Sequence, residues 1–206
     1  MPQLFSPRAD RRLRGIFGLA AAALVLGLSL AYGLSRSDGA WGVGTPAPQP
    51  IPFSHAIHAG SQGAGGQGAG GIGLDCRFCH ATVERSASAG MPTAETCLGC
   101  HRQVWSVGAQ FAPLRTALAM DTPVSWASVH RLPEHVRFHH AAHVTAGIGC
   151  AQCHGPVATM PRTIKTEPQS MGWCLDCHRG RSPGQSAYAH FGVEVPPLTR
   201  CSTCHR

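Results

Sequence analysis

Ten cysteines constrain this chain more than any other feature, because all of them fall in five Cys-x-x-Cys pairs and a histidine follows each pair at once. The pairs, numbered here as motifs one to five, are Cys76/Cys79, Cys97/Cys100, Cys150/Cys153, Cys174/Cys177 and Cys201/Cys204, followed by His80, His101, His154, His178 and His205. This pattern is the attachment signature of c-type haem, in which two thiols bond to the porphyrin and the histidine becomes the proximal iron ligand. The spacing predicts five covalent c-type haems.

Paired cysteines also occur in structural zinc sites, disulfides and thioredoxin-type redox pairs. With histidine at 13 of 206 positions, a histidine would follow all five pairs by chance with a probability on the order of 10⁻⁶. Zinc sites do not require histidine at that one offset, and disulfide scaffolds scatter their cysteine spacings. Haem attachment is therefore the favoured interpretation.

The composition indicates a chain that cofactors hold together. It contains 25 glycines and 16 prolines, and only 6% of its residues are aromatic. A chain so poor in core-forming side chains needs covalent cross-links, bound metals or covalent cofactors for stability. Its strand signals are weak. We expect a multihaem cytochrome c fold that is mostly irregular, with short α-helices wrapped around five covalent haems, a helix over residues 111–120 and one N-terminal transmembrane helix.

The N-terminal part contains an uncharged apolar run of 20 residues, from 15 to 34. This length is enough to span a bilayer as a helix, and the four arginines before it favour a cytoplasmic N-terminus. The alternative is a cleaved signal peptide, with Ser29 and Ala31 as small residues near a cleavage site, although the run exceeds the usual apolar region of about 7–15 residues. We favour a retained single-pass anchor in the cytoplasmic membrane of a bacterium, with the haem domain on the periplasmic side.

The expected organisation follows from these segments and from an internal repeat. Each copy of the repeat reads Phe-x-His-x-x-His followed by two haem motifs, and motif five is an unpaired addition. A Gly-rich insert at 59–73 lengthens the first copy. The predicted parts are a basic cytoplasmic N-terminus 1–14, the anchor 15–34, a linker 35–52 and a pentahaem domain 53–206, with repeat one at 53–102, repeat two at 138–179 and the fifth haem at 201–205.

The net charge of +7 does not indicate a nucleic-acid partner. Residues 1–34 carry +3 of it, from four Arg and one Asp, which leaves +4 for the rest. Five haems with their propionates and ferric irons would bring the exported part to about −1 when oxidised. We expect no nucleic acid among the partners.

The repeated Phe-x-His-x-x-His segments are the best source of second, distal iron ligands. Histidines at i and i+3 are neighbours on one side of a helical turn, so each segment can serve two adjacent haems. The candidates are His55, His58, His140 and His143. For the additional haem we favour His130, with Met171 as the alternative, and we expect His135, His139 and His190 to be solvated or hydrogen-bonded to propionates.

These motifs resemble the class III multihaem cytochromes c, and the segment from Val129 to Gly155 with the anchor and the terminal motif resembles the pentahaem subunits of bacterial alternative complex III. The resemblance implies an electron-transfer subunit of a quinol:electron-acceptor oxidoreductase, which is not catalytic by itself. It implies polytopic membrane subunits, an iron–sulfur protein and a monohaem cytochrome c or terminal oxidase as partners. The alternatives are a stand-alone membrane quinol dehydrogenase cytochrome that feeds a periplasmic reductase, and a multihaem reductase with one open haem.

The coordination state of the irons separates the electron-transfer hypothesis from the open-haem reductase. Two histidines on each iron leave no site for substrate, so the ferric holoprotein should show only low-spin EPR signals and the reduced protein should bind no CO. A high-spin ferric signal, or CO binding at a fraction of the haem, would contradict this prediction.

Overall fold

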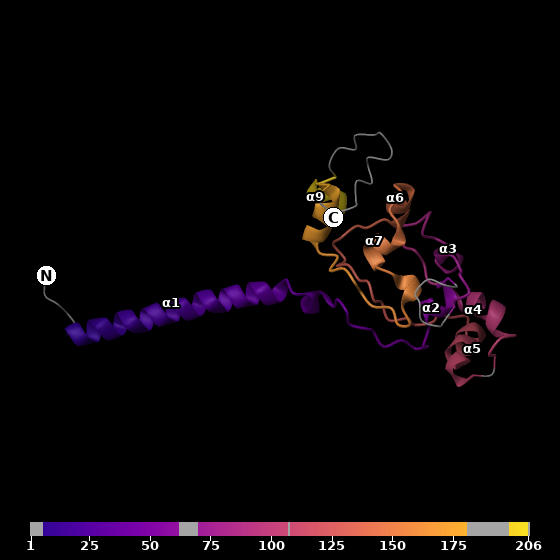
Figure 1. The fold of residues 1–206 in the computed structure, drawn as a ribbon, viewed down its shortest axis with the longest axis horizontal. Coiled ribbons are helices and arrows are strands. Elements are labelled where there is room, and N and C mark those ends of the chain that lie inside the picture. Colours follow the sequence, from indigo (N-terminus) through magenta and orange to yellow (C-terminus); the bar gives the residue numbers. More distant parts are fainter. Residues whose placement is uncertain (1–5, 62–69, 107, 181–197, 206) are drawn as a thin grey trace. The chain divides into compact units, whose positions relative to one another are not determined.

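The computed structural model describes residues 6–61, 70–106, 108–180 and 198–205 (Figure 1). The chain divides into two compact units, Met1–Gly42 and Val43–Arg206. The first unit contains α1 (Pro7–Ser35) and the 3₁₀ turn η1 (Asp38–Trp41). The second contains α2 (His55–His58), α3 (Cys76–Cys79), α4 (Ala94–His101), η2 (Ala109–Phe111), α5 (Ala112–Ala119), α6 (His140–Thr145), α7 (Cys150–His154), η3 (Val157–Thr159), α8 (Met171–His178) and α9 (Cys201–Cys204).

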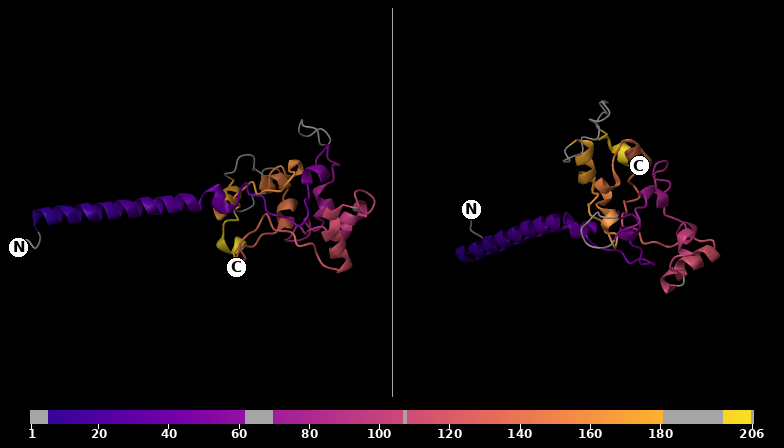
Figure 2. Two further views of the ribbon diagram at one scale, coloured as in Figure 1. Left: turned by 90° about the horizontal axis from the view of Figure 1, so that it is seen from below. Right: turned by 45° about the vertical axis from the view of Figure 1, so that its right-hand side comes forward.

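Helix α1 is one continuous helix of 29 residues (Figure 2). It begins at Pro7, eight residues before the apolar run, because Ser6 caps it with a hydroxyl that accepts from the Ala9 N–H at 3.3 Å and proline is favourable in the first turn. Asp10 and Arg14, one turn apart, pair at 2.9 Å. The most apolar window of α1 has a mean hydropathy of 2.0. By length and composition α1 can cross a membrane, as a signal sequence also can.

The helices of the second unit are short, between four and eight residues long. Every haem motif forms a helical turn, as the sequence predicts. Helices α4 and α8 begin before the cysteines of their motifs, and their N-termini are capped by Thr93 and Ser170, respectively. The helix expected at 111–120 is present as η2 followed by α5. Across the described ranges the chain forms no strands, and its only β-type pairings are the isolated bridges Val43–Lys165 and Val136–His205.

One hydrophobic cluster lies where α4 packs against α5 (Figure 1). Its buried members are Ile51, Ala94, Leu98, Phe111, Leu114 and Ala117. Cys97 of motif two packs against this cluster. Motif two is therefore held by ordinary apolar packing, which is the main driving force of folding in most proteins.

The two repeats are interlocked by backbone hydrogen bonds. In repeat one, the Ala56 N–H donates to the Met160 carbonyl at 3.0 Å, and α2 packs against η3. In repeat two, the Ala141 N–H of α6 donates to the Ser86 carbonyl of repeat one at 3.1 Å. Each His-x-x-His turn is thus docked on the segment that follows the first haem motif of the other repeat.

The later part of the predicted linker 35–52 is hydrogen-bonded into the second unit. From Val43 onward it belongs to the second unit, where the Gly44 N–H donates to the Lys165 carbonyl at 2.8 Å. The Gln49 amide donates to the Ala127 carbonyl at 2.8 Å and accepts from the Ala127 N–H at 3.0 Å. These bonds hold residues 43–52 along the haem-binding unit.

Replacing Leu114 by alanine should lower the free energy of unfolding by about 2–5 kcal/mol, because the side chain is only 3% exposed and its removal leaves a cavity in the cluster. Urea denaturation of the holoprotein, followed by far-UV circular dichroism, measures this change. Met120→Ala is the control, since Met120 follows the same helix and is 66% exposed. Equal losses for the two variants would contradict the assignment of this cluster as a packed core.

Candidate haem-binding sites

The two Phe-x-His-x-x-His segments have the same local geometry. In the first, the Phe53 ring stacks on His58 with centroids 4.5 Å apart at 27°, and meets His55 edge-on at 4.9 Å and 89°. In the second, the Phe138 ring stacks on His143 with centroids 4.5 Å apart at 29°, and meets His140 edge-on at 4.8 Å and 90°. The phenylalanine therefore fixes the orientation of both imidazoles in each copy, and the internal repeat is structural as well as sequential.

The second histidine of each segment has one ring nitrogen engaged by the backbone. His58 Nδ1 lies 2.8 Å from the Ser54 carbonyl oxygen, and His143 Nδ1 lies 2.9 Å from that of His139. A carbonyl only accepts, so Nδ1 carries a proton, and in the neutral ring Nε2 then has a free lone pair. This is the tautomer that an iron ligand bound through Nε2 requires.

These two rings face the motif histidines of the second motif in their own repeat. The centroids of His58 and His101 lie 6.0 Å apart at 60°, and those of His143 and His178 lie 6.1 Å apart at 66°. Two imidazoles that share one metal ion at about 2 Å per nitrogen have centroids about 6 Å apart. The observed separations match this requirement in both repeats.

The first histidines of the segments lie near motifs one and three. The rings of His140 and His154 are 6.3 Å apart and nearly parallel, at 7°. His140 Nδ1 donates to the Ala87 carbonyl at 2.7 Å, which again leaves Nε2 free. In the first copy, burial lowers the pKa of His55 to about 4, with further lowering from His80, so the ring is neutral. His55 is thus held in the neutral form that can ligate iron, and the backbone engages His140 through Nδ1.

The histidine of motif one is oriented by a glycine turn. His80 Nδ1 donates to the Gly90 carbonyl at 2.8 Å. Gly90 has a positive φ of 75°, and a Cβ there would lie 2.7 Å from Thr82 Oγ1. A larger residue at this position would move the carbonyl that orients His80.

The predicted fifth distal ligand, His130, is a half-buried residue with an unpartnered nitrogen. Its Nε2 is buried without a hydrogen bond, and its ring meets His154 edge-on at 4.3 Å and 87°. Burial lowers the pKa of His130 to about 4, with further lowering from His154 and Lys165. The alternative ligand, Met171, is 64% exposed at the start of α8.

His135, expected to be solvated or hydrogen-bonded to propionates, is exposed, and its ring lies beside motif five. His135 has its ring centroid 5.6 Å from that of His205, at 16°. The sequence signal for this placement was faint, because the contact joins residues 70 positions apart through an isolated bridge. His139 is exposed, and His190 lies outside the described residues.

The ten thiols are unpaired by disulfides, and neighbouring motifs influence one another. Burial raises the pKa of Cys97, and Cys79 of motif one adds to this. Burial also raises the pKa of Cys76 of motif one, and Cys150 of motif three adds to this through its charge and a hydrogen bond. Burial raises the pKa of Cys153 to about 11, with Cys177 and Cys174 of motif four contributing. The raised pKa values keep Cys76, Cys97 and Cys153 protonated at neutral pH.

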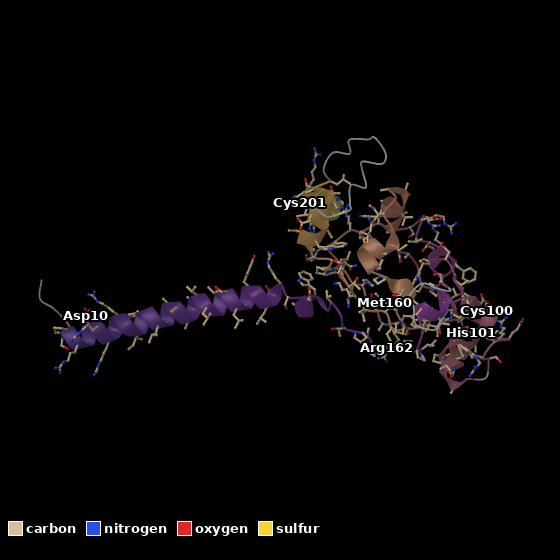
Figure 3. All side chains as sticks on the ribbon, viewed as in Figure 1. Asp10, Cys100, His101, Met160, Arg162 and Cys201 are labelled. Carbon is tan, nitrogen blue, oxygen red and sulfur yellow. The ribbon has the colours of Figure 1, made fainter. Side chains whose placement is uncertain are left out.

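Motif five continues this series, because Cys204 raises the pKa of Cys174 after the larger effect of burial. These electrostatic influences between thiols link the motifs in the order two, one, three, four, five. Figure 3 agrees, since it places Cys100 of motif two and Cys201 of motif five on opposite sides of the second unit.

The donor set fits c-type haem. Each motif presents two cysteines three residues apart on a helical turn, followed by a histidine, and imidazoles with a free nitrogen face the motif histidines at distances that suit a shared iron. Within the described ranges no three His, Cys, Asp or Glu side chains gather to hold a bare metal ion.

Comparison with known proteins agrees with this geometry. Residues 136–206 match the family model described as cytochrome c7 and related cytochrome c. The multihaem cytochrome c subunit of menaquinone reductase from Nitratidesulfovibrio vulgaris (strain Hildenborough) is 32% identical over 165 residues, which cover 76% of this chain and 67% of that protein. The chain belongs to the multihaem cytochromes c, which are electron-transport proteins that carry c-type haem.

Proposed function

We propose that this chain binds five c-type haems and serves as the electron-transfer subunit of a membrane quinol:electron-acceptor oxidoreductase of the alternative complex III type. The observation that carries the proposal is the second histidine near each motif histidine, at 6.0 Å for His101 and 6.1 Å for His178. When bound, c-type haem supplies one-electron redox chemistry. Two protein ligands on each iron leave no coordination position for a substrate, which favours electron transfer over a reductase with an open haem.

The proposed ligands are those that the sequence nominates. The thiols of the five motifs hold the porphyrins, and the motif histidines are the proximal ligands. On the distal side, His55 serves motif one, His58 motif two, His140 motif three and His143 motif four. The matched geometry of the two repeats supports this assignment, because equivalent histidines face equivalent motifs.

The series of motifs gives the unit two ends. Motif two lies on the α4–α5 cluster, and motif five is the last motif of the sequence. Each of them has one neighbouring motif in the series of electrostatic influences between thiols. We place the exchange of electrons with partner proteins at these ends. The sequence alone gives no such order.

A membrane position is part of the proposal. Helix α1 is apolar over a length that spans a bilayer, and its first turns carry the basic residues that favour a cytoplasmic N-terminus. We propose that α1 is retained as a single-pass anchor in the bacterial cytoplasmic membrane, with Val43–Arg206 on the periplasmic side. One helix is too little to enclose a quinol, so the quinol site is formed by polytopic partner subunits.

A second candidate function differs in the direction of electron flow. The relative from N. vulgaris is named as a subunit of menaquinone reductase. A chain with the same role would pass electrons toward a membrane quinone instead of receiving them from a quinol. The ligands and the anchor would be the same in both functions.

Purification from native membranes in mild detergent, with subunits identified by mass spectrometry, tests the proposed assembly. We expect large polytopic subunits and an iron–sulfur protein to accompany the chain. Reduction of its haems by added quinol would then support quinol oxidation, whereas oxidation of pre-reduced haems by added menaquinone would support the second function. Recovery of the chain alone, or with only a soluble reductase, would contradict a subunit role.

The hydrogen bond between His55 Nδ1 and Thr163 Oγ1, 2.8 Å long, should set the potential of one haem. In Thr163→Val the imidazole loses this partner and donates less electron density to iron, so one midpoint potential should rise. A bond worth about 1 kcal/mol corresponds to a rise of about 40 mV for a one-electron couple. A spectroelectrochemical titration of the holoprotein measures the shift.

Thr159→Val is the matched control, because the Thr159 hydroxyl donates to the Pro156 carbonyl at 2.9 Å instead of to a histidine. Its potentials should equal those of the unmodified protein. The same set of potentials in Thr163→Val would show that His55 is not an iron ligand oriented by Thr163.

A further inference from the structure

Motif five needs a distal ligand from outside the Phe-x-His-x-x-His segments. The four histidines of those segments lie near motifs one to four, and His58 and His143 face the histidines of motifs two and four at 6.0 and 6.1 Å. The remaining described histidines outside the motifs are His130, His135 and His139.

His135 is the one that faces motif five. Its ring centroid lies 5.6 Å from that of His205, close to the separation of about 6 Å that two imidazoles on one metal ion would have. The ring planes differ by 16°. A separation in this range is shared with the pairs of motifs two, three and four.

The backbone holds His135 in this position. The next residue, Val136, forms an antiparallel bridge with His205. The Arg137 N–H donates to the Cys204 carbonyl at 2.7 Å, and the Val136 N–H closes a turn on the Pro133 carbonyl at 2.9 Å. The segment 133–137 is therefore joined to motif five at Val136 and Arg137, and the turn on Pro133 sets the position of His135 beside this junction.

His130 has a different neighbour. Its ring is 4.3 Å from that of His154 in motif three, which is too close for two imidazoles on opposite sides of one iron. The nearly parallel ring of His140, at 6.3 Å, already faces His154 at a suitable distance. Nothing joins His130 to motif five as the bridge joins His135.

We infer that His135 is the distal ligand of the haem bound by Cys201, Cys204 and His205. This inference rests on the proposed binding of five haems and replaces His130 as the ligand of the fifth. Its Nε2 or Nδ1 lone pair would fill the sixth coordination position of that iron and keep it low-spin.

His135→Gln in the full chain, purified with its haems attached, tests the assignment. Glutamine keeps a polar side chain of similar length but removes the imidazole. We expect the mass of the variant to show five haems, its ferric EPR spectrum to gain one high-spin haem per chain, and the reduced protein to bind about one CO per chain. His130→Gln and His139→Gln are the matched controls and should remain entirely low-spin.

A low-spin His135→Gln variant that binds no CO would overturn the assignment. A high-spin haem in His130→Gln would identify His130 as the distal ligand of the fifth haem instead. His135→Met provides a second readout if His135→Gln does not mature. Methionine can replace histidine on iron and raises the potential, so one midpoint potential should rise while the haem stays low-spin. Unchanged potentials in His135→Met would also overturn the assignment.

The unmodified protein separates this inference from the proposed function. Five haems, all low-spin, in the unmodified protein leave only the identity of the fifth ligand in question. Fewer than five haems by mass, or a high-spin signal before any substitution, would contradict the proposed function itself, whatever the variants show.

Discussion

The hydrogen bond from a histidine Nδ1 to a backbone oxygen is the interaction on which the haem-binding unit depends. It fixes the tautomer, orients the ring and leaves Nε2 free for a metal. His58, His80 and His140 each make such a bond at 2.7–2.8 Å. Because these oxygens belong to turns close to the haem motifs, the conformation of the loops determines the positions of the ligands.

This dependence explains the architecture. An apolar cluster supports motif two, and among the described residues the other motifs are connected by loop hydrogen bonds and by the interlocked repeats. Haem, once attached, would supply the apolar surface that such a chain lacks, so that cofactor binding and folding stabilise each other. The two repeats dock on one another through Ala56 and Ala141, which places motifs one and three together at the centre of the series.

Much of this arrangement can be predicted from the sequence, because the decisive signals are local. The five motifs, the repeat, the short helices and the helix at 111–120 all follow from spacings of a few residues. The early start of α1 was also readable, since Ser6 followed by Pro7 is a helix-start signal. The position of His135 beside motif five could not be read from the sequence. It depends on a bridge between Val136 and His205, which no local pattern encodes.

The central claim is that each motif histidine shares its iron with a second histidine of the same chain. An experimental density map of the holoprotein, at a resolution that shows the axial ligands, tests this claim most directly. The account predicts continuous density from iron to His58 opposite His101, to His143 opposite His178 and to His135 opposite His205. An iron with water, or with a residue of a partner subunit, in its sixth position would contradict it.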